Sequence, residues 1–462
     1  MINQDTIVAL ATPSGAGAIA IIRISGKQAI GIAEKQFQSV SGKQLSKQAT
    51  HTIHLGHIMD GDRTIDQVLL SIFKNPNSYT GEDVVEISCH GSNYIQQEII
   101  QLFLRQGCRM ATAGEFTLRA FLNGKLDLSQ AEAVADLISS DNEAAHQIAM
   151  QQMRGGFSSE IAKLREELLN FASLIELELD FAEEDVEFAD RKQFKDLIER
   201  ISIVLKRLID SFAVGNVIKE GIPVAIVGEP NVGKSTLLNA LLNEDRAIVS
   251  EIAGTTRDTI EDEISIGGIG FRFIDTAGIR ETEDVVESIG IKKTFEKIDQ
   301  AQVVIYLFDA HDFNDKSSVL KVELEKIKNK YPQKPLLVIA NKIDKVDDVL
   351  IAKIQSEIPE IKLLSAKSGF GIEQLTNSLL ELINTGSLRN NETIITNSRH
   401  YDALLKAFQE IQKVKYGLET GLSGDFLAID IRQALYHFGE ITGEITNDDL
   451  LGNIFANFCI GK

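Results

Sequence analysis

The spacing of apolar residues first indicates short strands. Residues 1–118 hold β-rich runs separated by Gly, Asn and Pro, namely GAIAIIRISG, THTIHLGHI, TIDQVLLSIF and GEDVVEISCHG. Only one clear helix is predicted among them, from residue 92 to residue 105, because Ile95, Ile99 and Leu102 recur at helical spacing. This pattern predicts an α+β domain.

Apolar residues then step by three and four from residue 119 to residue 217, which predicts helices with one buried face each. The two clearest stripes are Leu164, Leu168, Phe171 and Ile175, and then Phe194, Leu197, Ile201, Val204 and Leu208. The same spacing returns between residues 385 and 462, at Leu404, Phe408, Ile411 and Leu418.

Between these helical stretches, residues 218–384 alternate strands with helices. The strands IPVAIVG, FRFIDTAG, AQVVIYLFDA, PLLVIANK and IKLLSA are almost continuously apolar, which is typical of a mostly parallel sheet covered on both faces. We therefore expect a multidomain protein in which this α/β domain is inserted into a discontinuous all-α domain, residues 119–217 and 385–462.

Charge and cysteine content narrow the class of protein. With 47 basic against 67 acidic residues the formal net charge is −20, so nucleic acid contact needs a local basic patch or a partner. Three cysteines without ligand-like spacing fit a reducing compartment. The first residues do not resemble a secretory signal and the apolar runs are too short to span a bilayer, so we expect a cytoplasmic protein without membrane contact.

The segment GEPNVGKS, residues 228–235, lies between a predicted strand and a predicted helix. Its glycines let backbone N–H groups surround phosphates, Lys234 reaches the outer phosphates, and the Ser235 hydroxyl can bind magnesium. This arrangement predicts a site for a nucleoside triphosphate.

Two further segments, each at a strand end, identify the base. In NKID, residues 341–344, Asp344 can accept hydrogen bonds from the N1–H and the exocyclic amine of guanine, and adenine offers no such pair. In SAK, residues 365–367, a backbone N–H can be donated to the guanine oxygen. Because both segments follow the phosphate loop in this order along the sequence, we predict that the nucleotide is GTP.

Two switch segments are predicted between the phosphate loop and NKID. EIAGTTRD, residues 251–258, contains Thr256 as the second magnesium ligand, and in DTAG, residues 275–278, Asp275 and Gly278 would sense the ion and the outermost phosphate. The residues predicted to bind GTP are Asn231, Val232, Gly233, Lys234, Ser235, Thr236, Ser250, Glu251, Ile252, Ala253, Gly254, Thr255, Thr256, Asp275, Thr276, Ala277, Gly278, Asn341, Lys342, Asp344, Ser365, Ala366 and Lys367.

Hydrolysis needs a group that holds the attacking water, and Ile279, which follows DTAG, cannot form the hydrogen bond. Four acids follow it, at Glu281, Glu283, Asp284 and Glu287. Asn231 could in addition hold a monovalent cation beside the phosphates, where other GTPases use an arginine. Alternatively, Asn231 only shapes the loop and a partner supplies catalysis.

Taken together, these segments resemble the MnmE (TrmE) family of bacterial tRNA modification GTPases over the whole chain. The resemblance is carried by GEPNVGKSTLLNALL, IAGTTRD, DTAGIR with Glu287, AGEFTLRAFLNGKLDLSQAEAVADLI at 113–138, and FCIGK. Generic GTPases have neither of the last two. The resemblance implies an N-terminal folate-binding domain that dimerises (1–118), a discontinuous helical domain and an inserted G domain (218–384).

For turnover, the resemblance implies activation by potassium and by dimerisation of the G domains. The residues that would surround the ion are Asn231, Ser250, Ile252 and Thr255. Lys234 and Glu287 would act in catalysis, Glu287 by orienting the water through an intermediate contact.

For the tRNA chemistry, the resemblance implies a homodimer that forms a heterotetramer with an MnmG-like FAD protein. Together they would add an aminomethyl-type group to carbon 5 of the wobble uridine of certain tRNAs. A tetrahydrofolate derivative, 5-formyl- or 5,10-methylene-tetrahydrofolate, would supply the one-carbon unit. The folate-binding residues would be Arg23, Glu82, Lys125 and Lys462. Cys459 is either catalytic or a small buried apolar group.

A second class of function stays open at this point. A regulatory or ribosome-assembly GTPase that only switches partner binding would share the phosphate loop, the switches and NKID. The N-terminal domain and FCIGK favour tRNA modification, because an assembly factor needs neither and usually carries a basic RNA-binding module.

Overall fold

The computed structural model describes residues 5–180, 191–242, 262–274, 295–382, 393–456 and 458–461. The chain forms two compact units. The first consists of Met1–Ile138, Met150–Ile203 and Asp402–Lys462, and the second of Ser139–Ala149 and Val204–Tyr401. No helix within the described ranges is both long enough and apolar enough to cross a bilayer.

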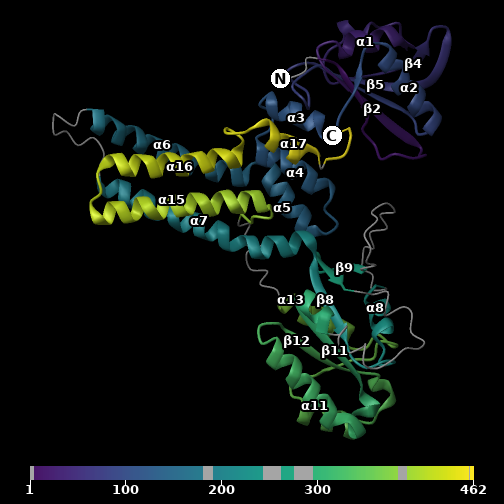
Figure 1. Cartoon of the computed structure of the whole chain (residues 1–462). Coiled ribbons are helices and arrows are strands. Elements are labelled where there is room, and N and C mark those ends of the chain that lie inside the picture. The colour runs from purple at the N-terminus through teal and green to yellow at the C-terminus, as the bar shows by residue number, and fades with distance from the viewer. Residues whose placement is uncertain are drawn as a thin grey trace. The chain divides into compact units, whose positions relative to one another are not determined.

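The first unit contains a seven-stranded sheet of order β3-β4-β5-β6-β2-β1-β7. Figure 1 labels its strands β2, β4 and β5. Its pairs are antiparallel except β1–β7, which is parallel. The strands are β1 (Ile7–Leu10), β2 (Ile19–Ser25), β3 (Phe37–Ser39), β4 (Thr52–Asp60), β5 (Arg63–Phe73), β6 (Val84–His90) and β7 (Arg109–Met110). The four β-rich runs of the sequence correspond to β2, β4, β5 and β6, and the predicted α+β class is confirmed.

Helix α2 (Asn93–Arg105) is the helix that the sequence predicts in this region. The expectation of a single helix was wrong, because α1 (Ala29–Gln36) and a 3-10 turn (Leu45–Lys47) are also present. Helix α1 has eight residues and no capping side chain, so its periodicity is too short to distinguish it from a strand by sequence. It is stabilised by packing, since Ile30 and Ile32 are buried against the sheet.

The two faces of this sheet differ in their surroundings. Ile22, Ile24 and Ile87 point to the face covered by α1 and α2, where Phe103 is also buried. The other face carries the exposed apolar residues Ile19, Ile53, Leu55 and Leu69, whereas around β1 it is covered, since Ile7 and Ala9 are buried with Phe116. Alternation along each strand produces this division, since successive side chains point to opposite faces.

Helices make up the rest of the first unit. Helix α6 packs along α16 (Figure 1), and the predicted stripe residues Leu164, Leu168 and Ile175 are buried. Three more helices, α5, α7 and α15, have residues in both units. The helices are α3 (Glu115–Leu122), α4 (Leu128–Ile138), α5 (Glu143–Met153), α6 (Gly156–Asp180), α7 (Arg191–Glu220), α15 (Ser398–Thr420), α16 (Gly424–Thr442) and α17 (Asp448–Ala456). The predicted discontinuous all-α domain is confirmed as a class of fold.

The second unit contains a six-stranded sheet of order β13-β12-β11-β8-β10-β9. Its described pairs are parallel except β10–β9. The strands are β8 (Ile222–Val227), β9 (Asp262–Ile266), β10 (Ile269–Phe273), β11 (Val303–Asp309), β12 (Leu336–Asn341) and β13 (Lys362–Leu363). The mostly parallel α/β sheet is thus confirmed. Strand β9 was not predicted, because its five residues, DEISI, include only two apolar ones and it lies at the sheet edge.

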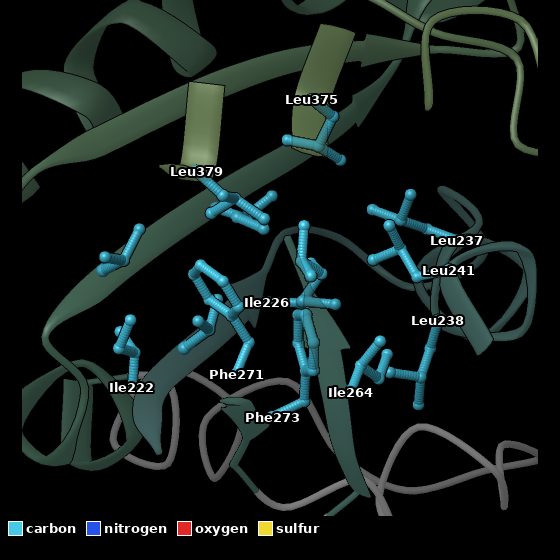
Figure 2. Close-up of a cluster of buried hydrophobic side chains, with 14 of the residues drawn as sticks. Ile222, Ile226, Leu237, Leu238, Leu241, Ile264, Phe271, Phe273, Leu375 and Leu379 are labelled. Atoms are coloured by element: carbon cyan, nitrogen blue, oxygen red, sulfur yellow. The ribbon is translucent and has the colours of Figure 1, made fainter. Parts of the chain in front are cut away.

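Helices cover both faces of this sheet. Figure 2 shows Leu237, Leu238 and Leu241 of one helix and Leu375 and Leu379 of another in the cluster that also holds the strand residues. These helices are α8 (Lys234–Leu242) and α13 (Ile372–Glu381), and the opposite face is packed by α11 (Phe313–Lys330) and by α12 (Asp348–Glu357). The phosphate loop, NKID and SAK follow β8, β12 and β13, so all three lie at the carboxyl edge of parallel strands, where α/β sheets bind ligands.

Candidate functional site

The phosphate loop joins β8 to α8 in a conformation that requires glycine. Gly228 has a φ of +144° and Gly233 a φ of +103°, and Asn231 is left-handed at +63°. A Cβ would lie 2.0 Å from the Leu307 oxygen at the first position and 2.3 Å from Asn341 Nδ2 at the second. Only glycine avoids both the unfavourable φ and the close approach. The loop therefore has the tight turn that lets backbone N–H groups surround phosphates.

Lys234 lies over this loop. Its Nζ donates to the carbonyl oxygens of Gly228 and Glu229, both at 2.8 Å. Burial, and secondarily the charge of Lys297, lower the pKa of Lys234 to about 8 against the opposing charge of Glu229. A phosphate group would offer this ammonium full negative charge in place of carbonyl dipoles. The geometry is compatible with the predicted phosphate contact.

Asn341 connects the three loops to one another. Its side chain is buried, its Nδ2 donates to the Val232 carbonyl at 2.8 Å, and its Oδ1 accepts from the Ala366 N–H at 3.0 Å. One amide therefore joins the segments that follow β8, β12 and β13. It fixes the distance between the phosphate loop and the predicted base-binding loops.

Asp344 is oriented by a residue of the SAK segment. Ser365 Oγ donates to Asp344 Oδ1 at 2.6 Å, and this hydrogen bond lowers the pKa of Asp344. The Lys342 backbone has a left-handed conformation. Its Nζ donates to the backbone oxygen of Asn231 at 2.7 Å and to Asp309 Oδ2 at 2.8 Å. The structure thus holds the carboxylate ionised in the place where guanine N–H donors are predicted. Asp309, the last residue of β11, was not among the predicted site residues, because no recognised motif surrounds it.

The remaining predicted ligands of the nucleotide and its ions lie outside the described residues. They are Ser250, Glu251, Ile252, Ala253, Gly254, Thr255, Thr256, Asp275, Thr276, Ala277, Gly278 and Glu287. Of the described residues, Ser235 and Thr236 lie in the first turn of α8, and Asn231 is exposed at the loop. Hydroxyl and amide oxygens suit magnesium and potassium, so the donor set fits the predicted ions.

No group of three or more His, Cys, Asp or Glu that could hold a metal ion occurs within the described ranges. The predicted magnesium and potassium ligands are oxygen atoms of Ser, Thr and Asn and of the backbone, and both sites stay predictions.

A second group of predicted residues lies in the first unit, around Arg23 on β2. The Arg23 guanidinium carbon is 5.4 Å from the ring centroid of Tyr79 and 5.6 Å from that of Phe116. Its Nε donates to Glu86 at 2.8 Å and its Nη1 to the Gly461 oxygen at 3.2 Å. Two aromatic rings and a backbone carbonyl therefore hold Arg23 next to the FCIGK segment.

Glu82 and Lys125 lie at a second short segment, residues 79–82, which also contains the Tyr79 ring beside Arg23. The Glu82 carboxylate accepts from Ser25 Oγ at 2.7 Å and from Arg119 Nη1 at 3.1 and 3.3 Å. The Lys125 side chain packs on Gly81, since a Cβ there would lie 3.2 Å from Lys125 Cε. The structure thus places Arg23, Glu82 and Lys125 around residues 79–82. Lys462, the fourth predicted folate ligand, lies outside the described residues.

A charge network behind Glu82 was missed by the sequence reasoning. Arg119 is buried, and its Nη2 donates to Asp5 Oδ1 at 2.9 Å and to Glu115 Oε1 at 3.0 Å. Arg109 Nε donates to Asp5 Oδ2, and its Nη2 donates to Glu115 Oε1, both at 2.6 Å. The hydrogen bond from Arg109 lowers the pKa of Asp5. The only local signal was the four-residue spacing of Glu115 and Arg119 on α3.

Cys459 is exposed, so the expectation that it could be a small buried group was wrong. Ile460 forms an antiparallel bridge with Ala113, and the Gly114 N–H donates to the Cys459 oxygen at 3.4 Å. Phe458 is buried in a cluster with Phe455, and the next residue of the extended segment points away from that cluster. A catalytic role for Cys459 stays a prediction.

Comparison with known proteins gives matches along the whole chain. A family model described as the MnmE helical domain matches residues 128–459, and one described as the GTP-binding protein TrmE N-terminus matches residues 6–125. The chain is 77% identical over 462 residues to a tRNA modification GTPase MnmE of Flavobacterium psychrophilum, with 100% of each chain covered. It is 75% identical over 466 residues to the protein of the same name from Flavobacterium johnsoniae, again with 100% of each covered.

Among solved structures, the FeoB G-domain from Methanococcus jannaschii is 24% identical and has a TM-score of 0.24. The match covers 35% of this chain and 97% of that one. A likeness at this TM-score supports no further conclusion.

Proposed function

The chain belongs to the MnmE (TrmE) family of tRNA modification GTPases, and from this premise we propose how its residues divide the work. It is a GTPase that acts in tRNA modification. We propose that potassium stimulates hydrolysis and that an MnmG-like flavoprotein joins it in a heterotetramer. Together they add an aminomethyl-type group to carbon 5 of the wobble uridine of certain tRNAs, with a one-carbon unit from 5-formyl- or 5,10-methylene-tetrahydrofolate. Because tRNA and GTP are its substrates, we place it in the cytoplasm.

The proposed domains are a folate-binding and dimerisation domain (1–118), a helical domain (119–217 and 385–462) and a G domain (218–384). This division is supported by the position of the two sheets, since β1 to β7 lie within the first range and β8 to β13 within the last.

In the proposed nucleotide site, Asp344 accepts hydrogen bonds from guanine and Lys234 neutralises the outer phosphates. The Ser365 hydrogen bond supports the first role, because it orients the carboxylate before the base arrives. Ser235 and Thr256 would hold magnesium, which supplies positive charge against the phosphates when it is bound. The magnesium role of Ser235 is supported by its position directly after Lys234, at the start of α8.

For turnover we propose that Asn231, Ser250, Ile252 and Thr255 together offer oxygen atoms to potassium. A potassium ion held there supplies the positive charge that an arginine supplies in other GTPases. Asn231 supports the proposal because Lys342 binds its backbone oxygen and fixes the left-handed turn, while its side chain stays exposed. Glu287 would orient the water, since Ile279 is unable to do so.

In the proposed folate site, Glu82 accepts from the pterin N–H groups, and Arg23 and Lys125 pair with oxygen atoms of the ligand, with Lys462 nearby. The observation that carries the proposal is that Arg23 and Lys125, far from Glu82 in sequence, both lie against residues 79–82, the segment to which Glu82 belongs. A GTPase that only switches partners has no need of such a cluster.

The exposed sheet face supports a homodimer through the N-terminal domain. The strand register aligns Leu55, Leu69, Ser88 and Ile21 in one row across β4, β5, β6 and β2. The neighbouring row contains Ile53, Ser71, Glu86 and Arg23. An exposed apolar face of this kind is typical of a protein interface, and Arg23 places the proposed folate site at its border.

The proposal is tested by nucleoside analysis of tRNA from cells that lack the chain. We expect loss of the nucleosides modified at carbon 5 of the wobble uridine, and recovery with the unaltered chain but not with Asp344→Asn. Asp348→Asn, which changes an exposed acid on α12 in the same way, should restore the modification. Unchanged nucleosides together with a ribosome-assembly defect would instead favour the regulatory alternative.

A further inference from the structure

The carboxylate of Glu82 is held by a chain of two hydroxyl groups, those of Thr80 and Ser25. The Glu82 N–H donates to Thr80 Oγ1 at 3.2 Å, and Thr80 Oγ1 lies 2.7 Å from Ser25 Oγ. Ser25 Oγ in turn donates to Glu82 Oε2 at 2.7 Å. Because Ser25 has one hydroxyl proton and donates it to the carboxylate, Thr80 donates to Ser25. Glu82 accepts at the end of this chain.

The charge network reaches Glu82 through Arg119 alone among the described arginines. Arg109 and Arg119 both contact Asp5 and Glu115, so those two acids would keep one cationic partner if Arg119 were lost. The Glu82 carboxylate pairs with Arg119 at 3.1 Å, and the side chain of Arg119 is 4% exposed against 16% for Glu82. Arg119 therefore lies behind Glu82, on the side away from solvent.

We propose that Arg119 and Ser25 are positioning residues for folate, which hold the Glu82 carboxylate in place and aimed at the N–H donors of the reduced pterin. This inference rests on the proposed folate function. A carboxylate can accept about four hydrogen bonds, two at each oxygen atom. Ser25 and Arg119 both donate mainly to Oε2 of Glu82. Oε1, which is 3.3 Å from Arg119 Nη1, keeps capacity for the ligand. A side chain fixed in advance loses little freedom when the ligand binds, which raises affinity.

The test measures binding of 5-formyltetrahydrofolate to the full-length chain by calorimetry. Arg119→Met should weaken binding about tenfold or more, and Ser25→Ala about threefold to tenfold, because a charged hydrogen bond contributes more than a neutral one. In a Glu82→Gln background, each change should have less than about a twofold further effect, since it acts through the lost carboxylate.

A second arm changes the ligand instead of the protein. A reduced folate whose exocyclic pterin amine is replaced by methyl cannot use Glu82 fully, so Arg119→Met should hardly alter its affinity. Arg105→Met is the matched control. It breaks an exposed ion pair with Asp60 at 2.8 Å in the same domain and should leave folate affinity unchanged.

The outcomes separate the two hypotheses. Losses that are as large in the Glu82→Gln background as without it overturn the positioning role while leaving the folate site intact. No binding of folate by the unaltered chain overturns the proposed function, and the positioning role with it. If Arg119→Met does not fold, the positioning role is tested by Ser25→Ala alone and by Ser25→Ala in the Glu82→Gln background.

Discussion

Asn341→Ala should loosen the nucleotide-binding loops while leaving the hydrophobic core beneath them intact. The Asn341 side chain is 2% exposed, and its amide serves the Val232 carbonyl and the Ala366 N–H. Both of these residues are themselves buried, at 3% and 6% exposure. Alanine provides neither a donor nor an acceptor, so both backbone groups lose their partner.

The size of the effect follows from these two groups. A buried backbone group without a partner costs about 1–3 kcal/mol, which gives roughly 2–6 kcal/mol for two. Water can reach loops at a sheet edge more easily than a core, so we expect the lower part of that range, about 2–4 kcal/mol. The loops should therefore open roughly 30- to 1,000-fold more often.

Hydrogen exchange followed by mass spectrometry on the nucleotide-free, full-length chain measures this opening. Peptides that contain Ala366 and those that contain Val232 should exchange faster, whereas peptides from β11 should not change. Asn314→Ala is the matched control, because the Asn314 amide accepts from Lys353 Nζ at 2.8 Å on the exposed face of α11. Wild-type exchange rates in the Asn341→Ala loops would refute the idea that one amide couples them.

Four further outcomes are expected. GTP affinity should be constant below about pH 8 and fall above it with uptake of a proton, because burial lowers the pKa of Lys234 to about 8 and phosphates favour its charged form. Calorimetry in buffers of different ionisation enthalpy measures that proton. Asp344→Asn should weaken GTP binding at least tenfold in a binding titration, since guanine loses an ionised acceptor. Glu287→Ala should abolish hydrolysis in a GTPase assay while GTP affinity stays close to normal. Replacing potassium by sodium should slow turnover, and Asn231→Ala should remove the difference between the two salts.

Each of these expectations can fail in its own way. Affinity that does not change between pH 7 and pH 9.5 would mean that Lys234 stays charged in the free loop. Equal binding of GTP by Asp344→Asn would move base recognition elsewhere. A large loss of GTP affinity in Glu287→Ala would indicate a structural role, and equal rates in potassium and sodium would remove the proposed ion site.

The sequence predicted the elements whose pattern is local. The parallel strands were found because each is a continuous apolar run, and the phosphate loop, NKID and SAK were found because each lies at the end of such a run. The alternating edge strand β9 and the eight-residue helix α1 were missed, because packing rather than local periodicity stabilises them.

In the candidate sites too, the sequence predicted contacts between recognisable motifs and missed contacts between residues outside them. Ser365 and Asp344 are joined by a hydrogen bond across 21 positions, which the spacing of two motifs had suggested. The network of Asp5, Arg109 and Arg119 brings residues together across as many as 114 positions, and no periodicity marks such contacts. Cys459 is exposed because its neighbour Phe458 is buried and successive residues of an extended segment point to opposite sides. The sequence alone did not show which of the two residues would be buried.

The packing of α6 along α16 has a consequence for synthesis on the ribosome. More than two hundred residues, among them the entire six-stranded sheet, separate the end of α6 from the start of α16. At ~5–20 residues per second, the apolar side of α6 would wait on the order of 10 to 50 seconds for its partner. A nascent chain of this protein therefore exposes the apolar side of a long amphipathic helix while residues 181–423 emerge, and chaperones that bind such surfaces should associate with it during that interval.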